Sequence, residues 1–294
     1  IRKLERIHLI VRVCMPVGVA APGKSIVGTA IDCGGHLRLM VAMIDEARTA
    51  PIEISVVIPV YNEGDNLEPL MRELREAFAG RLAAEVILVD DGSIDDTAVR
   101  FATLRGAHRL SLRLIRHVDN RGQSAAILTG VTSAAADIVA TLDGDGQNDP
   151  ADIPILLDAY RRAFARGVRL VAGQRIRRRD TWMRRVSSRL ANFVRSLVLH
   201  DHIADTGCGL KVFDRVTFLR IAPFDHMHRF LPALFLGYGA GVHTVPVHHR
   251  PRRHGYSKYG VRNRLWVGIV DLFGVKWLMR RAIASMPLAT DERT

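Results

Sequence analysis

The five residues Asp143-Gly144-Asp145-Gly146-Gln147 follow directly after the apolar run Ile-Val-Ala-Thr-Leu at residues 138–142. This run predicts a buried strand, and ligands of an α/β sheet bind beyond the carboxyl ends of its strands. Two carboxylates this close repel each other unless a cation lies between them, and Mg²⁺ and Mn²⁺ prefer oxygen ligands. The stretch therefore predicts a metal site that could neutralise a diphosphate, although Asp and Gly are also common in ordinary turns.

Two earlier segments have the same organisation. Residues 54–60 are a β-branched run followed by the polar residues 61–63 and then by a helical pattern of apolar residues at 67–78. Residues 85–89 are a second such run, and the acidic turn 90–93 follows it. Strands that alternate with helices predict an α/β fold with a mostly parallel sheet flanked by helices. The carboxyl ends of parallel strands share one edge of the sheet, where a nucleotide would bind.

Several polar blocks occur along residues 53–260 in a recognisable order and spacing. They are Pro59-Val60-Tyr61-Asn62-Glu63, Asp90-Asp91-Gly92-Ser93, Gly122-Gln123-Ser124-Ala125, Asp143-Gly144-Asp145-Gly146-Gln147, Gly173-Gln174-Arg175, Arg184-Arg185-Val186-Ser187-Ser188-Arg189, Asp205-Thr206-Gly207-Cys208-Gly209-Leu210-Lys211-Val212-Phe213 and Arg252-Arg253-His254-Gly255-Tyr256-Ser257-Lys258. In these blocks the chain resembles the family 2 glycosyltransferases of the GT-A fold. Within that family it resembles the dolichol-phosphate mannosyltransferase and polyprenyl-phosphate glycosyltransferase type. The resemblance implies a GT-A domain with a Rossmann-like nucleotide-binding half.

The resemblance also implies roles for individual residues. A divalent metal, Mg²⁺ or Mn²⁺, would be bound by Asp143, Asp145 and Gln147. Asp143, Asp145 and Arg175 would be the catalytic residues, and the metal would act as a Lewis acid for the leaving nucleoside diphosphate. The donor site would consist of Pro59, Tyr61, Glu63, Val89, Asp91, Asp143, Gly144, Asp145, Arg175, Arg252 and Lys258.

The acceptor is expected to be a lipid phosphate bound by Arg184 and Ser188. These two residues are four apart, so they would share one face of a helix. A phosphate oxygen is already anionic at neutral pH, so a strong general base is unnecessary and direct attack would invert the anomeric carbon. The role of Asp205 stays open between a functional carboxylate, a partner that orients Lys211, and a residue that caps a turn.

The positive charge of the chain is concentrated in two segments. The 294 residues carry a formal net charge of +12. Residues 161–195 contain twelve arginines and one acid, and residues 250–264 contain six lysines and arginines and no acid. Nucleic acid is disfavoured as a partner because these runs have no interleaved stacking aromatics, whereas an anionic membrane and a phosphorylated lipid fit them. Some of the arginines would form an ordinary solvated helix face.

The two ends of the chain are expected to lie outside the GT-A domain of residues 49–260. Residues 261–294 predict a C-terminal amphipathic helix and tail, with Leu265, Ile269, Leu272 and Phe273 on one face. The apolar stretch is too short to span a bilayer. An interfacial helix is favoured over a core helix, because two tryptophans lie near the ends of the stretch and basic residues flank it.

Residues 1–48 are expected to be an N-terminal extension that is disordered or non-native, because they lack the motifs of the family. Met43, just before the first strand, is a candidate start of the native chain. Arg12 interrupts the only candidate signal-peptide core. Cysteine spacing indicates neither disulfides nor a metal finger, which favours a reducing cytosol. We therefore expect a cytoplasmic protein that is peripheral on the cytosolic face of a membrane. The residues do not indicate an oligomeric state.

Together these observations predict inverting, metal-dependent transfer of a hexose from a nucleotide-sugar donor to a polyprenyl or dolichyl phosphate. GDP-mannose is the first expectation for the donor and UDP-glucose the second. A family 2 transferase that extends a glycan is an alternative, and it would need a carboxylate base near the acceptor. A catalytically silent, membrane-bound nucleotide-binding scaffold is an alternative of a different class.

Overall fold

The computed structural model describes residues 52–80, 82–104, 111–176, 195–199, 201, 203, 205–252 and 261–281, with side chains from residue 268 onward in the last range. Contacts divide the chain into two units, Ile1–Thr49 and Ala50–Thr294, and all described residues belong to the second. The predicted site residues Arg184, Ser188 and Lys258 lie outside the described residues, as does the N-terminal extension.

The described residues form a seven-stranded sheet with the strand order β3-β2-β1-β4-β6-β5-β7. The strands are β1 (Ile54–Val60), β2 (Ala84–Asp90), β3 (Ser111–Arg116), β4 (Ile138–Thr141), β5 (Val168–Arg175), β6 (Lys211–Asp214) and β7 (Gly241–Val247). Every neighbouring pair is parallel except the two pairs that involve β6. The sheet is therefore mostly parallel, as the sequence predicts.

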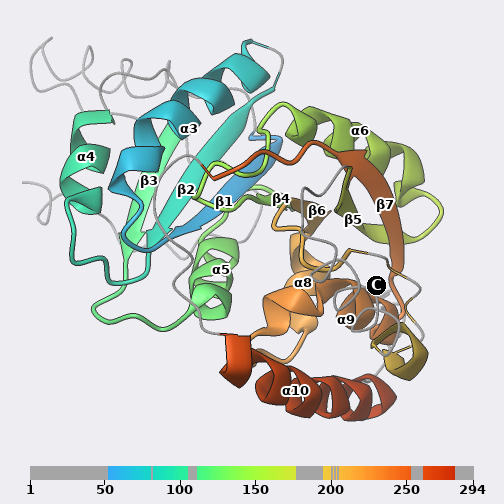
Figure 1. Ribbon diagram of the computed structural model, residues 1–294. Coiled ribbons are helices and arrows are strands. Elements are labelled where there is room, and N and C mark those ends of the chain that lie inside the picture. The colour runs from blue at the N-terminus through green and yellow to red at the C-terminus, as the bar shows by residue number, and fades with distance from the viewer. Residues whose placement is uncertain are drawn as a thin grey trace, which may run out of the picture. The chain divides into compact units, whose positions relative to one another are not determined.

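Helices cover both faces of this sheet (Figure 1). The described helices are α3 (Gly64–Phe78), α4 (Thr97–Leu104), α5 (Gln123–Thr132), α6 (Asp152–Phe164), α8 (Arg215–Arg220), η1 (Met227–Arg229), α9 (Leu231–Gly237) and α10 (Val261–Arg281). The side chains of α3, α4 and α6 belong to one buried cluster, and those of α5, α8, α9 and α10 belong to the other. The result is three layers with two hydrophobic cores.

Strand β1 shows why both faces are covered. Val56 and Ile58 face the first cluster, whereas Val57 between them faces the second, because successive side chains of a strand point to opposite faces. All three are fully buried. A strand buried on both faces has a continuous apolar sequence, which is the pattern of residues 54–60.

The sheet topology brings polar residues from distant parts of the chain to one edge. Parallel strands β2 and β5 end there at Asp90 and Arg175. Because β6 is antiparallel, it begins where its neighbour β4 ends, and Lys211 lies opposite Thr141. The residues that follow Thr141 are therefore next to a lysine about 70 positions later in the sequence.

Helix α10 differs from the amphipathic helix predicted for its segment. The prediction placed Leu272 on the same face as Ile269 and Phe273, but the three side chains differ in burial. Leu272 and Val275 are buried in the second core cluster, because α10 packs along α9, whereas Ile269 is 41% and Phe273 64% exposed. The helix thus has a packed face and a separate exposed apolar face. Among the described residues, no helix is both long and apolar enough to cross a membrane.

Candidate active site

Asp143 lies two residues beyond the end of β4, held between two other segments. Its Oδ1 accepts a hydrogen bond from Gln123 Nε2 at 2.9 Å, at the start of α5. On the other side lies Gly209, where an added Cβ would be only 2.0 Å from Asp143 Oδ2. The backbone at Gly209 is held in this place because its carbonyl accepts a hydrogen bond from the hydroxyl of Thr141 at 2.7 Å. Asp143 therefore occupies a space that only a glycine at position 209 leaves open.

The environment of Asp143 disfavours its ionised form. Burial, followed by the neighbouring charge of Asp145, raises the pKa of Asp143 to about 6. The positive charges of Lys211 and Arg175 and the hydrogen bond from Gln123 act in the opposite direction without cancelling the effect. A carboxylate pair of this kind is stabilised by a cation, so the donor set suits a hard divalent metal.

Arg175, at the end of β5, forms a bidentate pair with Asp205. Arg175 Nε and one terminal nitrogen each lie 2.7 Å from an oxygen of Asp205, and the Arg175 backbone N–H also donates to it at 3.2 Å. Burial is the largest single effect and lowers the pKa of Arg175, but the hydrogen bond and the charge of Asp205, with smaller contributions from Cys208 and Asp143, together raise it. Asp205 therefore pairs with Arg175, and among the described residues no hydrogen bond joins it to Lys211.

Lys211 is a buried cation that the sequence prediction did not include among the site residues. Only 4% of its surface is exposed, and Nζ donates a hydrogen bond to the carbonyl of Cys208. Burial lowers the pKa of Lys211, an effect partly offset by Cys208 and Asp143. The signal in the sequence is a single lysine within the apolar stretch Leu210-Lys211-Val212-Phe213.

These residues line a pocket of about 580 Å³ on the α5 side of Asp143. Its walls come from residues 120–123 before and at the start of α5, from residues 205–211, and from residues 225–231 around η1. Asp143 and Arg175 complete it. The pocket thus joins segments that are more than a hundred residues apart in the sequence.

His228, which lines this pocket, forms a polar contact with Ser124. Ser124 Oγ lies 2.8 Å from His228 Nδ1 and accepts from the His228 backbone N–H at 3.3 Å. Burial, followed by the charges of Arg229 and Lys211, lowers the pKa of His228 to about 3. The imidazole is therefore neutral near pH 7, and its Nδ1 can accept the Ser124 hydroxyl proton in a hydrogen bond. No sequence motif pointed to His228.

Asp145 faces a different set of groups from Asp143. Its Oδ2 accepts a hydrogen bond from Arg252 at 2.8 Å, and the same guanidinium lies 3.8 Å from Glu63 Oε1. Gln147 donates its backbone N–H to Asp145 Oδ1 at 3.1 Å. Three predicted donor-site residues, Glu63, Asp145 and Arg252, are thus brought together.

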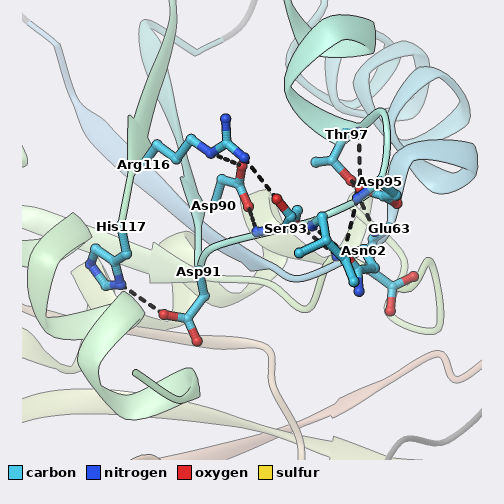
Figure 2. A network of polar contacts seen from close by, with 10 residues as sticks. Asn62, Glu63, Asp90, Asp91, Ser93, Asp95, Thr97, Arg116 and His117 are labelled. Carbon is cyan, nitrogen blue, oxygen red and sulfur yellow. Dashed lines mark hydrogen bonds and ion pairs between the residues drawn. The ribbon is translucent and has the colours of Figure 1, made fainter. Parts of the chain in front are cut away.

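The turns after β1 and β2 are joined by hydrogen bonds (Figure 2). Asn62 adopts a left-handed backbone conformation with φ of 51°, and its backbone N–H donates to Ser93 Oγ at 2.9 Å. Its side-chain oxygen accepts from the Ile94 backbone N–H at 2.8 Å. Ser93 N–H in turn donates to Asp90 Oδ1 at 2.8 Å. The two polar blocks recognised in the sequence are therefore one connected structure.

Asp91, a predicted donor-site residue, holds the loop that leads into α5. It accepts hydrogen bonds from the backbone N–H groups of Arg121 at 2.9 Å and Gly122 at 2.8 Å, and Oδ1 lies 2.7 Å from His117 Nδ1 (Figure 2). Asp91 is only 4% exposed. Its contacts within the described residues position the loop that forms one wall of the pocket.

The remaining predicted donor-site residues lie on or next to strands β1, β2 and β4. Pro59 and Val89 lie opposite each other in the β1–β2 register, and Val89 is fully buried in the core. Gly144 packs against β1, where an added Cβ would be 2.6 Å from Val60 Cγ1. Tyr61 is partly buried at the end of β1. Among the described residues, no group of three or more His, Cys, Asp or Glu side chains has metal-binding geometry, and the predicted ligands are two carboxylates and an amide.

Comparison with known proteins identifies the family to which the chain is similar. The profile described as glycosyl transferase family 2 matches residues 55–221. The chain is 35% identical over 233 residues to dodecaprenyl-phosphate galacturonate synthase of Rhizobium johnstonii, covering 78% of this chain and 68% of the relative. It is 36% identical over 211 residues to undecaprenyl-phosphate 4-deoxy-4-formamido-L-arabinose transferase of Edwardsiella ictaluri, covering 71% of this chain and 63% of the relative. The chain thus spans about two thirds of the length of these curated relatives.

Comparison with solved structures shows which known fold the chain resembles. Glucosyl-3-phosphoglycerate synthase from Mycobacterium tuberculosis, in complex with Mn²⁺, UDP and glucosyl-3-phosphoglycerate, has a TM-score of 0.58 and 18% identity. The likeness covers 87% of this chain and 88% of that one. A second structure of the same enzyme, with Mg²⁺ and UDP, also has a TM-score of 0.58. These likenesses confirm the GT-A fold predicted from the sequence.

Proposed function

Because this chain belongs to glycosyl transferase family 2, we propose that it transfers a sugar from a nucleoside diphosphate to a polyprenyl phosphate. The observation that carries the proposal is the convergence of Asp143, Asp145, Arg175 and Lys211 at one edge of the sheet. Both relatives are named for a polyprenyl phosphate and a sugar, which supports this substrate class.

A divalent metal fits the carboxylates of the site. Asp143, Asp145 and Gln147 would hold Mg²⁺ or Mn²⁺, which supplies Lewis-acid stabilisation of the leaving diphosphate. The raised pKa of Asp143 supports this assignment, because a nearby positive charge would favour the ionised form. Arg252, hydrogen-bonded to Asp145, would orient that carboxylate and add positive charge on the donor side.

The chemistry of the pocket favours a phosphate acceptor over a sugar hydroxyl. A hydroxyl acceptor needs a base, but Asp205 is engaged by Arg175 and burial keeps His228 a weak base. A phosphate oxygen needs no base: it attacks the anomeric carbon while the bond to the nucleoside diphosphate breaks, which inverts the configuration. This reasoning favours polyprenyl phosphate over the alternative of glycan extension.

The donor sugar is a separate part of the proposal. The sequence prediction of GDP-mannose, with UDP-glucose second, stays a prediction. Neither of the two relatives is named for mannose. The name of one contains galacturonate, and the name of the other contains a formamido-arabinose. We therefore place a nucleotide-linked uronic acid beside the two hexoses as candidate donors.

We also propose that the protein acts at the cytosolic surface of a membrane, with α10 against the lipid. The exposed apolar residues Ile269, Val270, Phe273 and Trp277 lie on α10 together with Arg280 and Arg281. Apolar side chains beside basic ones suit the interface of an anionic membrane. The division into an N-terminal extension, a GT-A domain of residues 49–260 and a C-terminal helix with its tail belongs to the same proposal.

The test is transfer of radiolabelled sugar to polyprenyl phosphate in liposomes. GDP-mannose, UDP-glucose and UDP-galacturonate are offered separately, with Mg²⁺ or Mn²⁺ and with chelator. We expect one donor to give a labelled lipid only when metal is present. Nucleotide-sugar binding without any transfer would instead support the catalytically silent scaffold.

Two variants separate the donor and acceptor sites. Asp145→Asn should abolish metal-dependent donor binding. Arg184→Ala should raise the KM for polyprenyl phosphate by about 10- to 100-fold, the effect of losing a charge-assisted contact, without changing nucleotide affinity. Weakened nucleotide binding in Arg184→Ala would place Arg184 in the donor site instead. Full activity of Asp145→Asn would rule out the metal assignment.

A further inference from the structure

We propose that Lys211 is an anion-binding residue of the pocket and receives an oxyanion of the substrate, either the phosphate of the lipid acceptor or a carboxylate of the transferred sugar. This inference rests on the proposed function for the identity of the ligand. It adds Lys211 to the site residues implied by the family resemblance, and it names the chemical class of ligand that the pocket would bind.

The first observation is the position of Lys211. It begins β6, between β4 and β5, and lines the pocket that Asp143 and Arg175 also line. It is only 4% exposed, so an ammonium group is kept in a place where water solvates it poorly. Placing a cation there is unfavourable unless an anion or several hydrogen-bond acceptors compensate it.

The second observation is that its neighbours leave this charge without a close partner. Among the described residues, no carboxylate oxygen lies within 4.0 Å of Nζ, and the hydrogen bond found for Nζ is the one to the carbonyl of Cys208. An ammonium group has three donors, so two remain for a ligand. Both oxygens of Asp205 lie 2.7 Å from Arg175, so its charge is shared with that guanidinium and acts on Lys211 only from beyond hydrogen-bond distance.

The third observation concerns the acidic charges around Lys211. The charges of Asp143 and, less strongly, Asp205 act on Lys211, but Asp143 Oδ1 is bound by Gln123 and Asp143 is a proposed metal ligand. Its negative charge would be shared with the metal when donor binds. An oxyanion that enters the pocket would then be the group that balances Lys211.

Other basic side chains line the same pocket. They are Arg121, Arg229 and His226, and the imidazole of His226 lies 3.5 Å from Asp225 and 3.2 Å from Asp271. The two guanidinium groups therefore add positive charge around a bound anion. Phosphate and carboxylate share this recognition chemistry, and the two candidate substrates supply one each. Lipid phosphate brings its oxyanion from the acceptor, whereas a uronic acid brings it at C6 of the donor.

Two matched pairs of ligands distinguish these sources. Farnesyl phosphate and farnesol differ only by the phosphate, and UDP-galacturonate and UDP-galactose differ only at C6 of the sugar. Binding is measured by calorimetry in the absence of membranes, with wild-type protein, Lys211→Met, Lys211→Gln and Lys211→Arg. Lys276→Met on α10 is the matched control, because it removes the same charge outside the pocket.

We expect the wild-type protein to prefer the anionic member of one pair. Lys211→Met and Lys211→Gln should reduce that preference by about 10- to 100-fold, whereas Lys211→Arg keeps part of it and Lys276→Met all of it. The ligand pair in which the preference falls identifies whether the oxyanion comes from the lipid phosphate or from the sugar. Lys211→Gln retains a donor for the Cys208 carbonyl, so it decides the question if Lys211→Met does not fold, as judged by circular dichroism.

The inference is overturned if folded Lys211→Gln binds all four ligands as the wild type does, or if the wild type prefers neither anionic ligand. Failure of the proposed function gives a different result. A wild-type protein that transfers no sugar, but prefers an anionic ligand in a Lys211-dependent manner, contradicts the transferase and leaves the anion site standing.

Discussion

At Asp143 a carboxylate is held in a place that favours its neutral form. Gly209 leaves just enough room for it, Gln123 donates one hydrogen bond to it, and Asp145 repels it. The arrangement stores electrostatic strain in the protein without metal. Such strain is typical of a site whose charge is meant to be balanced by a ligand.

The first prediction concerns the pH dependence of stability. The pKa of Asp143 is about 6 in the folded protein, above its ordinary value of 3.8, so the folded state binds this proton more tightly than the unfolded state. The contribution of protonated Asp143 to the free energy of unfolding is therefore lost as pH rises from about 4 to 6. Asp143→Asn removes the effect, and above pH 6 it should be more stable than the wild type by at most about 3 kcal/mol.

This difference is measured by urea unfolding with chelator at pH 4 to 8. Asp158→Asn, an exposed change on α6, is the control and should follow the wild type. A constant difference between Asp143→Asn and the wild type over this range would contradict the assignment of strain to Asp143.

The second prediction concerns Gly209. An added Cβ would be 2.0 Å from Asp143 Oδ2, so Gly209→Ala must displace the carboxylate or the backbone. We expect a loss of about 1 to 3 kcal/mol in the free energy of unfolding and a large loss of metal-dependent donor binding. Gly268→Ala on α10 is the matched control, because no atom lies within 4 Å of its added Cβ. Unchanged donor binding in Gly209→Ala would mean that the position of Asp143 is not critical.

At the scale of one element, α10 carries apolar side chains in two different surroundings. Leu272 and Val275 are buried against the core, whereas Phe273 and Trp277 are 64% and 62% exposed. The guanidinium of Arg281 lies 5.9 Å from the Trp277 ring centre. The packed face fixes the helix on α9, and this leaves the exposed face available to a membrane.

The third prediction follows from this division. The double change Phe273→Ser and Trp277→Ser should weaken binding to anionic liposomes by about 10-fold or more, since each large apolar side chain contributes on the order of 2 kcal/mol. The melting temperature should stay nearly unchanged. Val99→Ser with Ile155→Ser, on α4 and α6, is the control with similarly exposed side chains and should bind as the wild type does. Equal liposome binding by both double variants would refute a membrane role for α10.

At the scale of the whole molecule, the folded core belongs to the unit Ala50–Thr294. The sequence before it lacks the polar blocks and the apolar periodicity of the rest. Stability should therefore come from the two core clusters that cover the faces of the sheet.

The fourth prediction concerns the two ends of the chain. A protein that begins at Met43 should keep its activity and lose less than about 0.5 kcal/mol in the free energy of unfolding, because few buried contacts disappear. Removal of the residues after 260 should instead destabilise it by about 3 kcal/mol or more, because Leu272 and Val275 leave the core. Urea unfolding checks both. A large loss on removal of residues 1–42 would show that they pack on the domain.

Much of the architecture follows from local patterns in the sequence. The apolar runs at residues 54–60 and 85–89 predict strands β1 and β2, and the apolar periodicity after Glu63 predicts α3, because burial of strands and helix faces requires these periods. The acidic turns after the strands predict the edge of the sheet where the site lies. Local sequence is sufficient here because each feature depends on neighbours within a few residues.

Only the tertiary structure decides which distant residues meet. Antiparallel β6 places Lys211 beside β4, and Asp205 pairs with Arg175 thirty residues earlier. The exposed face of α10 is decided by packing on α9, which buries Leu272 and leaves Phe273 in solvent. The sequence alone indicated the family, the strands β1, β2 and β4, and the position of Asp143 and Asp145 just beyond β4. Which charged residues of the site pair with each other depends on which chain segments become neighbours on folding. The spacing of apolar residues along the chain does not contain this information.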